Sequence, residues 1–212
     1  MAGLRRQLGV APVWKMAISI TDLKKIVVQI PDTHLGTRDR ALLLLDFSGT
    51  FRRSELVALN VEDCRMIHEG MTIHLKRSKT DQEGQGRSVG IPHGQDPATC
   101  TVQACWAWLR AAKIETGPLF RGVNRHGQVL AKRLSSEAVA IVVKRYVSWL
   151  GYDVEDFAGH SLRAGLATAA AAAGKTERAI MQQTGHRSLT TVRRYIHDGN
   201  IFRDDTADGL GL

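Results

Sequence analysis

The spacing of hydrophobic residues changes several times along this chain, and its first part has the periodicity of helices. A helix is predicted to begin at Thr21, whose hydroxyl can cap the first turn before a periodic apolar segment. Pro31 and Gly36 then interrupt the pattern. Residues 39–47 are almost continuously apolar, which predicts a buried helix, and a further helix is predicted over residues 53–59.

The next segment alternates polar and apolar residues, as half-buried strands do. Residues 72–76 and 87–91 show this period, and the polar, glycine-rich residues 78–86 between them predict a hairpin loop. Residues 61–64 could supply a third strand. We therefore expect a small antiparallel sheet of about three strands.

From residue 97 onward the chain is expected to be helical, because apolar residues return to helical spacing and cap residues recur between the segments. The fold class that follows is α+β and mainly helical, with the small sheet packed beside a helical bundle. The predicted helices cover residues 101–112, 135–149, 161–173 and 177–184, and a last helix from residue 188 carries Tyr195.

The two ends of the chain lack this order. Residues 1–20 are basic and contain glycine and proline without a clear period, which predicts a linker or tail. Residues 198–212 are polar and contain glycine, which predicts a C-terminal tail. One domain is therefore expected over residues 21–197, a size that a single core can support.

Charge adds a class of partner to this picture. Lysine and arginine total 29 against 21 aspartate and glutamate residues, so the formal charge is +8 and the pI is near 9.8. Nucleic acid is the leading class of partner, and a basic protein without a polyanionic partner is the alternative. Three cysteines, an odd number, and no secretory signal favour reduced thiols in a cytoplasmic protein. No apolar run approaches the roughly 18 residues that span a membrane.

Several side chains of this sequence could together cleave a phosphodiester without a metal. That reaction needs an in-line nucleophile, positive charge on the non-bridging oxygens and an acid for the leaving oxygen. Arginine suits the second task, histidine and lysine suit proton transfer, and tyrosine can form a covalent phosphodiester. In chain order, the candidate residues are Arg52, Glu55, Lys79, His160, Arg163, His186 and Tyr195.

The order and spacing of these residues resemble the tyrosine recombinase, or phage integrase, family over residues 21–195. The motifs are Arg-Arg-Ser-Glu-Leu at 52–56, a lysine in the hairpin loop, His-x-x-Arg at 160–163, and Gly-His at 185–186 shortly before Tyr195. An isolated His-x-x-Arg would be weak, but the full set in this order is specific. The resemblance implies a catalytic domain that breaks and rejoins double-stranded DNA in site-specific recombination.

The resemblance also implies a role for each residue. Tyr195 resembles the nucleophile that joins the 3′ phosphate and releases a 5′ hydroxyl. Arg52 and Arg163 resemble the pair of arginines that hold the scissile phosphate. Lys79 resembles the loop lysine that protonates the leaving 5′ oxygen. No metal and no cofactor are implied.

The remaining residues resemble supporting groups of the family. His160 resembles the histidine that assists proton transfer at the tyrosine. His186 fills a position, His or Trp in the family, that hydrogen-bonds or packs on the phosphate. Glu55 resembles the acidic residue that supports the first arginine.

Neighbouring residues compete with two of these assignments. Arg53 adjoins Arg52, and counting back from Ser-Glu-Leu favours Arg52. Lys76 also flanks the hairpin, but the Lys-Thr-Asp order and the loop position favour Lys79, with Lys76 placed in the strand. Thr50 stands where the commonest form of the motif has glycine.

Members of the family usually carry a helical core-binding domain in front of the catalytic domain. Only about twenty residues precede the predicted domain here, so we expect a catalytic domain cut from a longer protein or naturally truncated. The resemblance implies a monomer without DNA and a homotetramer on paired DNA sites, in which residues 198–212 could dock on a neighbouring protomer. It also implies a bacterial or phage protein that is cytoplasmic and associated with the nucleoid.

Other functions stay open on the residues alone. A catalytically silent DNA-binding domain could keep the fold, and a type IB topoisomerase would share the cleavage chemistry. A metal-dependent hydrolase could use His160, His186 and His197, although its carboxylates are poorly placed. Further basic residues that could contact DNA phosphates are Lys132, Arg133, Lys144 and Arg145.

Overall fold

The computed structural model describes residues 15–76, 86–185 and 188–200. Its first three helices are α2 (Ile20–Gln29), α3 (His34–Gly49) and α4 (Arg53–Ala58). The cap of α2 is Ser19, whose hydroxyl oxygen accepts a hydrogen bond from the Asp22 amide at 3.0 Å, so the prediction of Thr21 as the cap was wrong.

Helix α3 begins earlier than predicted and includes Gly36. The Thr33 hydroxyl caps the helix by accepting from the Gly36 amide at 3.1 Å. A Cβ at Gly36 would lie 2.0 Å from the Pro31 carbonyl oxygen, so this glycine permits a close approach of the preceding loop instead of breaking the helix.

The predicted antiparallel sheet is confirmed, with strand order β1-β2-β3. Its strands are β1 (Cys64–Ile67), β2 (Gly70–Leu75) and β3 (Arg87–Pro92). A 3-10 helix (Val61–Asp63) precedes β1, so the third strand starts later than expected. Lys76 lies just beyond β2 instead of within it, and its Nζ is 2.7 Å from Asp63 Oδ1.

Between α5 (Thr101–Ala112) and α6 (Ser136–Val147) the chain forms a second hairpin where only helices were predicted. Strands β4 (Arg121–Val123) and β5 (Val129–Arg133) pair antiparallel. The turn is closed by Asn124, whose side-chain oxygen accepts from two turn amides, and by a left-handed glycine at position 127.

Arg133, at the end of β5, points into the protein. Its guanidinium donates to the carbonyls of Val57 and Leu59 at 2.5 and 2.9 Å and to Asn60 Oδ1 at 2.6 Å. Arg133 therefore holds the end of α4, and these hydrogen bonds direct its guanidinium into the protein and not toward solvent.

Two further candidates for DNA contact, Lys144 and Arg145 on α6, also form ion pairs within the protein. Lys144 Nζ lies 2.7 Å from Glu155 Oε1, and Arg145 Nη1 lies 3.1 Å from Asp39 Oδ2. Asp39 is fully buried and also accepts from the Tyr146 hydroxyl at 3.0 Å, so it joins α3 to α6.

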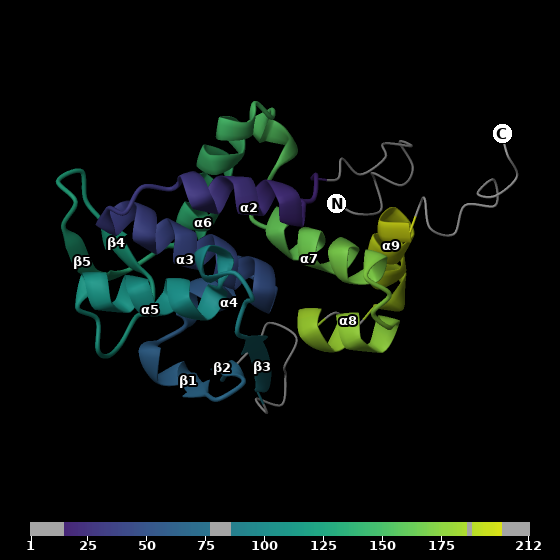
Figure 1. The fold of residues 1–212 in the computed structure, drawn as a ribbon, viewed down its shortest axis with the longest axis horizontal. Coiled ribbons are helices and arrows are strands. Elements are labelled where there is room, and N and C mark those ends of the chain that lie inside the picture. Colours follow the sequence, from purple (N-terminus) through teal and green to yellow (C-terminus); the bar gives the residue numbers. More distant parts are fainter. Residues whose placement is uncertain (1–14, 77–85, 186–187, 201–212) are drawn as a thin grey trace, which may run out of the picture.

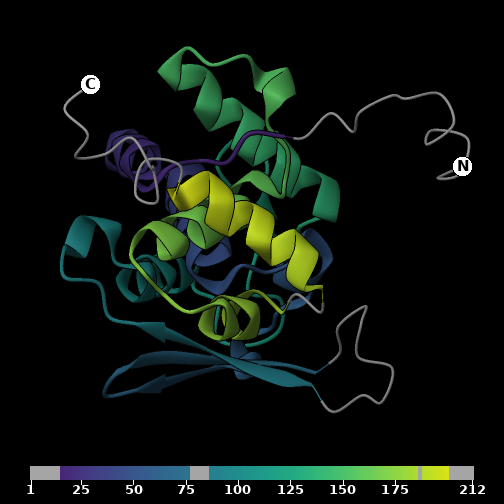
Figure 2. The same ribbon diagram turned by 90° about the vertical axis from the view of Figure 1, so that its right-hand side faces the viewer.

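The C-terminal part consists of α7 (Ser161–Ala172), α8 (Glu177–Thr184) and α9 (Leu189–Asn200). Helix α9 reaches Asn200, beyond the predicted start of the tail. Figure 1 shows α3 in the middle of the helices, with α2 and α5 beside it and α7–α9 at one end. Figure 2 shows the three-stranded sheet as a separate layer along one edge of the helical bundle.

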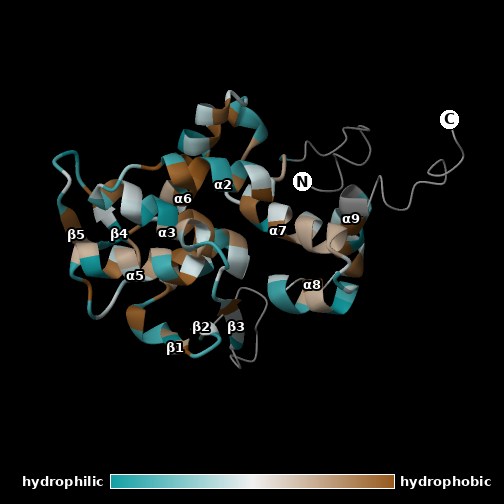
Figure 3. Cartoon of the chain, viewed as in Figure 1, coloured by the Kyte–Doolittle hydropathy of each residue, from teal (hydrophilic) through white to brown (hydrophobic). Residues whose placement is uncertain are grey.

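The buried apolar residues form two clusters of unequal size. The main cluster joins α2–α7 and the sheet around Trp108, Phe51 and Phe120. A small second cluster links α7, α8 and α9 and consists of Ala167, Ala171, Ile180 and Val192. The outer helices carry hydrophobic residues on one side and hydrophilic residues on the other (Figure 3), whereas the central α3 is buried on nearly all sides.

Candidate functional site

Arg52 and Glu55 form one ion pair at the start of α4. Arg52 is the residue before the helix, and Glu55 Oε2 accepts from its backbone amide at 2.9 Å. Glu55 Oε1 accepts from Arg52 Nη1 at 2.6 Å. The Glu55 side chain is 4% exposed and that of Arg52 is 22% exposed. The carboxylate therefore fixes the inner edge of a guanidinium whose other edge reaches the surface.

Arg163 lies in the first turn of α7 and is buried. Its Nη1 donates to the Thr50 carbonyl at 2.6 Å, and Thr50 adopts the left-handed conformation with φ of 49° at the end of α3. Burial and the positive charge of Arg52 are the leading causes that lower the Arg163 pKa to about 10. Arg163 stays charged at neutral pH beside a second cation, an arrangement that an anion would stabilise.

His160 precedes α7 and faces three arginines. Burial lowers its pKa, and the positive charges of Arg53, Arg163 and Arg52 lower it further. The imidazole is therefore neutral at pH 7 and able to accept a proton. Arg53 packs against the neighbouring Gly159, where a Cβ would meet Arg53 Cδ at 2.1 Å.

Tyr195 lies on α9, half-buried against the small second cluster. The α9 helix packs along α7, which brings Tyr195 near enough to Arg163 for a tyrosinate charge to raise the arginine pKa. The structure thus brings together five of the predicted residues: Arg52, Glu55, His160, Arg163 and Tyr195. Lys79 and His186 lie outside the described residues.

Arg87, at the start of β3, belongs to the same cluster and was not predicted as a site residue. Its Nη2 is 3.7 Å from Glu55 Oε2, and its Nη1 donates to the Gln183 carbonyl at 2.9 Å. Burial is the largest cause that lowers the pKa of Arg87. A signal existed in the sequence, because Arg87 shares the inward face of the strand with Val89 and Ile91. An arginine on an inward face requires a partner.

Asp46 is a fully buried acid behind the cluster. Neither carboxyl oxygen has a hydrogen-bond partner among the described residues. Burial raises the pKa of Asp46 well above its usual value, and the positive charges of Arg163 and Arg53 oppose the shift without cancelling it. Asp46 is therefore a buried acid that favours its neutral form.

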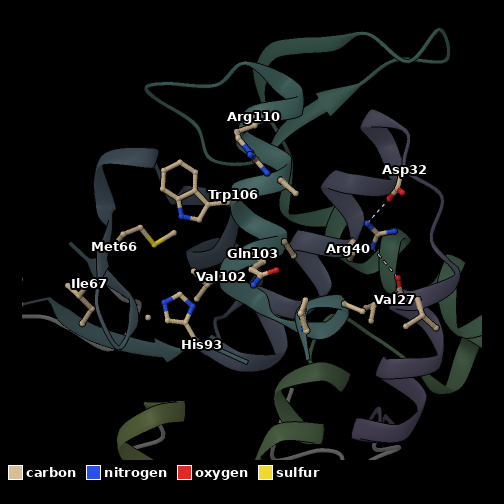
Figure 4. Close-up of a pocket in the computed structure, with 16 residues that line it drawn as sticks. Val27, Asp32, Arg40, Met66, Ile67, His93, Val102, Gln103, Trp106 and Arg110 are labelled. Carbon is tan, nitrogen blue, oxygen red and sulfur yellow. Dashed lines mark hydrogen bonds and ion pairs between the residues drawn. The ribbon is translucent and has the colours of Figure 1, made fainter. Parts of the chain in front are cut away.

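A groove of about 790 Å³ lies away from this cluster, between α2, α5 and the β1–β2 hairpin (Figure 4). Its surface is mainly apolar and includes the exposed side chains of Val28, Ile67 and Trp106, with Arg110 at its rim. None of the candidate site residues that the structure describes lines this groove.

Within the described ranges, no group of three or more His, Cys, Asp or Glu side chains could hold a metal ion. The hydrolase alternative included His186, which lies outside those ranges. No helix of the described part of the chain is long and apolar enough to cross a membrane.

The sequence of this chain is similar to a family of known proteins over nearly its whole length. The model of the phage integrase family matches residues 18–200. An integrase/recombinase XerD homologue of Selenomonas ruminantium is 41% identical over 211 residues, which cover 99% of this chain and 62% of that protein. Tyrosine recombinase XerC of Syntrophus aciditrophicus (strain SB) is 33% identical over 78% of this chain and 50% of that protein.

Solved structures show the same fold. The crystal structure of XerA recombinase matches with a TM-score of 0.66 and 20% identity, over 89% of this chain and 61% of that one. XerH site-specific recombinase bound to its difH substrate matches with a TM-score of 0.65 and 21% identity, over 88% of this chain and 50% of that one. This chain therefore spans about half to three fifths of the length of the proteins that it matches.

Replacing Asp46 by asparagine should make the protein more stable, and the gain should grow with pH. A carboxyl whose pKa is raised on folding contributes stability below its unfolded pKa and loses that contribution as pH rises toward its folded pKa. Asparagine does not titrate, so the Asp46→Asn advantage should grow by up to about 1.4 kcal/mol per pH unit above the usual carboxyl range. Urea unfolding at two pH values between 5 and 8 measures the difference.

The matched control is Asp39→Asn, on the same helix and equally buried. Asp39 has partners in Arg38, Arg145 and Tyr146, so its replacement should destabilise the protein by roughly 3 kcal/mol. A stability difference for Asp46→Asn that is unfavourable and independent of pH would contradict the neutral, unpaired state of Asp46.

Proposed function

The chain belongs to the phage integrase family, and from this premise we propose that it cleaves and rejoins DNA strands at specific sites through a covalent bond to Tyr195. The activity proposed is that of a tyrosine-type site-specific recombinase acting on double-stranded DNA. The observation that carries the proposal is the pair of arginines, Arg52 and Arg163, held by buried contacts beside the helix that carries Tyr195.

In the proposed reaction, the Tyr195 oxygen attacks the scissile phosphorus while the bond from phosphorus to the 5′ oxygen breaks. His160 accepts the tyrosine proton, and Lys79 gives a proton to the departing 5′ oxygen. The product is a 3′-phosphotyrosine with a free 5′ hydroxyl, and attack by a 5′ hydroxyl reverses each step. The phosphodiester energy is kept in the tyrosyl bond, so rejoining needs no external energy source.

Arg52 and Arg163 would act on the non-bridging oxygens. Both guanidiniums are fixed by contacts already present without DNA, so little reorganisation is needed when negative charge builds up on the phosphorane-like transition state. His186 would add a hydrogen bond or a packing contact to the same phosphate. No metal and no cofactor take part in the proposed steps.

Replacing Tyr195 by phenylalanine should abolish the covalent adduct. A DNA duplex nicked near the scissile phosphate traps the adduct, because the short fragment that carries the 5′ hydroxyl diffuses away. The adduct is measured by denaturing gel electrophoresis. Tyr152→Phe is the control, since Tyr152 is a surface residue whose hydroxyl donates to Asp22. Adduct formed by Tyr195→Phe at the native level would contradict the assignment.

The cleavage rate should fall in acid with a midpoint below 6.5, because protonated His160 cannot accept the tyrosine proton and its pKa is lowered in the free protein. Single-turnover cleavage at subsaturating DNA reports this midpoint. Saturating DNA should move it upward, because the bound phosphate offsets the charge of the arginines. His160→Gln should be slower and lack the acid limb, whereas exposed His68→Gln should keep it. An unchanged profile in His160→Gln would contradict the role.

We also propose that the protein is a monomer without DNA and a tetramer on paired sites, with residues 201–212 of one protomer bound in the groove of Figure 4 on the next. Those residues include Asp204, Asp205 and several apolar residues, a composition that suits an apolar groove with arginine at its rim.

Trp106→Ala should then weaken tetramer formation on two-site DNA without lowering adduct formation on a single site. Analytical ultracentrifugation measures the assembly. Trp149→Ala is a matched control, because Trp106 and Trp149 are each 46% exposed and Trp149 lies outside the groove. Equal assembly by both variants would contradict docking in this groove.

A further inference from the structure

We infer that Arg87 is a positioning residue that joins the Arg52–Glu55 pair to the turn in front of His186. The inference rests on the proposed function, because the residues that Arg87 contacts are those proposed to act in cleavage. It is drawn from three contacts that the Arg87 side chain makes with segments far apart in the sequence.

The first contact is with Glu55. This buried carboxylate accepts two hydrogen bonds from Arg52, and Arg87 Nη2 lies 3.7 Å from its Oε2. Glu55 is therefore placed between two cations. Removing the Arg87 charge would take away one of the two cations paired with Glu55, so its carboxylate, and the Arg52 guanidinium bonded to it, would be held less firmly.

The second contact is with the C-terminal end of α8. Arg87 Nη1 donates to the Gln183 carbonyl at 2.9 Å, one of the last carbonyls of the helix. A cation at this end also interacts favourably with the helix dipole. The Gln183 side chain donates to the Ser48 carbonyl at 2.7 Å, so the same residue also holds the end of α3.

The third contact is with Gly185, the residue immediately before His186. Gly185 ends α8 in the left-handed conformation with φ of 64°. A Cβ at this position would lie 3.2 to 3.4 Å from three atoms of the Arg87 guanidinium group, so the guanidinium lies directly beside the site of this glycine. Arg87 therefore contacts the residue at which α8 ends, next to His186 in the sequence.

Arg87 also lies close in sequence to Lys79, which falls between β2 and β3 and outside the described residues. The preceding Gly86 is left-handed, with φ of 68°, and a Cβ there would lie 2.6 Å from the Leu75 carbonyl oxygen at the end of β2. The end of β2 and the start of β3 thus approach closely. Arg87 connects the start of β3 to Glu55 on one side and to the end of α8 on the other.

The guanidinium is directed inward, which distinguishes this role from direct contact with DNA. The Arg87 Nη2 atom is buried and its Nη1 atom donates to the Gln183 carbonyl, so both terminal nitrogens face the protein interior. Burial is the leading cause of its lowered pKa. Its effect on the phosphate would therefore pass through Glu55 and Arg52 and through the end of α8.

The experiment compares Arg87→Gln and Arg87→Lys with the native chain, with Arg65→Gln as the control. Arg65 is an exposed arginine on β1 of the same sheet, so its replacement removes one charge without these contacts. Three quantities are measured: the single-turnover cleavage rate at saturating nicked DNA, the Kd for DNA, and the hydrogen exchange of peptides that cover α2, α6, α8 and α9.

Arg87→Gln should cleave roughly 10- to 100-fold more slowly, the effect of a small misplacement of catalytic groups, while its Kd stays equal to that of Arg65→Gln. Exchange should rise in α8 and α9 and stay unchanged in α2 and α6. Arg87→Lys should be intermediate, because lysine keeps the charge but not the fork. Thermal unfolding monitored by circular dichroism verifies that each variant is folded.

A double-mutant cycle with Glu55→Gln tests the path of the effect. If Arg87 acts through Glu55, the loss caused by Arg87→Gln should be smaller in the Glu55→Gln background than in the native one. Strictly additive losses, native exchange in α8 and α9, or a raised Kd with a native cleavage rate would each overturn the inference. Absence of adduct from the native chain would instead count against the proposed function, and the exchange data would still decide whether Arg87 holds the turn.

Discussion

The Glu55 carboxylate is the group on which the arrangement of this site depends. It is almost fully buried, so it requires cationic or hydrogen-bonding partners, and it finds them in the Arg52 side chain, the Arg52 amide and Arg87. The partners come from α4 and β3, and Arg87 in turn bonds the end of α8. One buried negative charge thereby positions the cations of the proposed phosphate site.

Thr50 provides the matching support on the other side. Its left-handed backbone ends α3 and turns its carbonyl toward Arg163, while its hydroxyl donates to the Gln183 carbonyl. Gln183 thus receives hydrogen bonds from both Thr50 and Arg87. The ends of α3 and α8 and the start of β3 meet at this residue, so segments more than a hundred residues apart share one anchoring point.

Much of this fold follows from local signals in the sequence. The helical spacing over residues 135–149 and 177–184 and the alternation in β2 and β3 each predicted an element that the structure contains. The β4–β5 hairpin was missed because its strands are short and half-exposed, so their periodicity is weak. Arg87 and Asp46 were missed for another reason: their importance comes from partners, or the absence of described partners, that long-range packing determines.

The small second cluster determines which part of the protein should lose its structure first. Tyr195 is supported by four buried residues, three of them alanine or valine, whereas the rest of the domain has the large aromatic core around Trp108. Segments with little buried apolar area open at lower free energy than the domain as a whole. Loss of structure under heat or protease would therefore begin at α8 and α9 and precede global unfolding. The storage lifetime would then depend on how firmly α9 holds Tyr195, the proposed nucleophile, and not on the melting temperature of the whole domain.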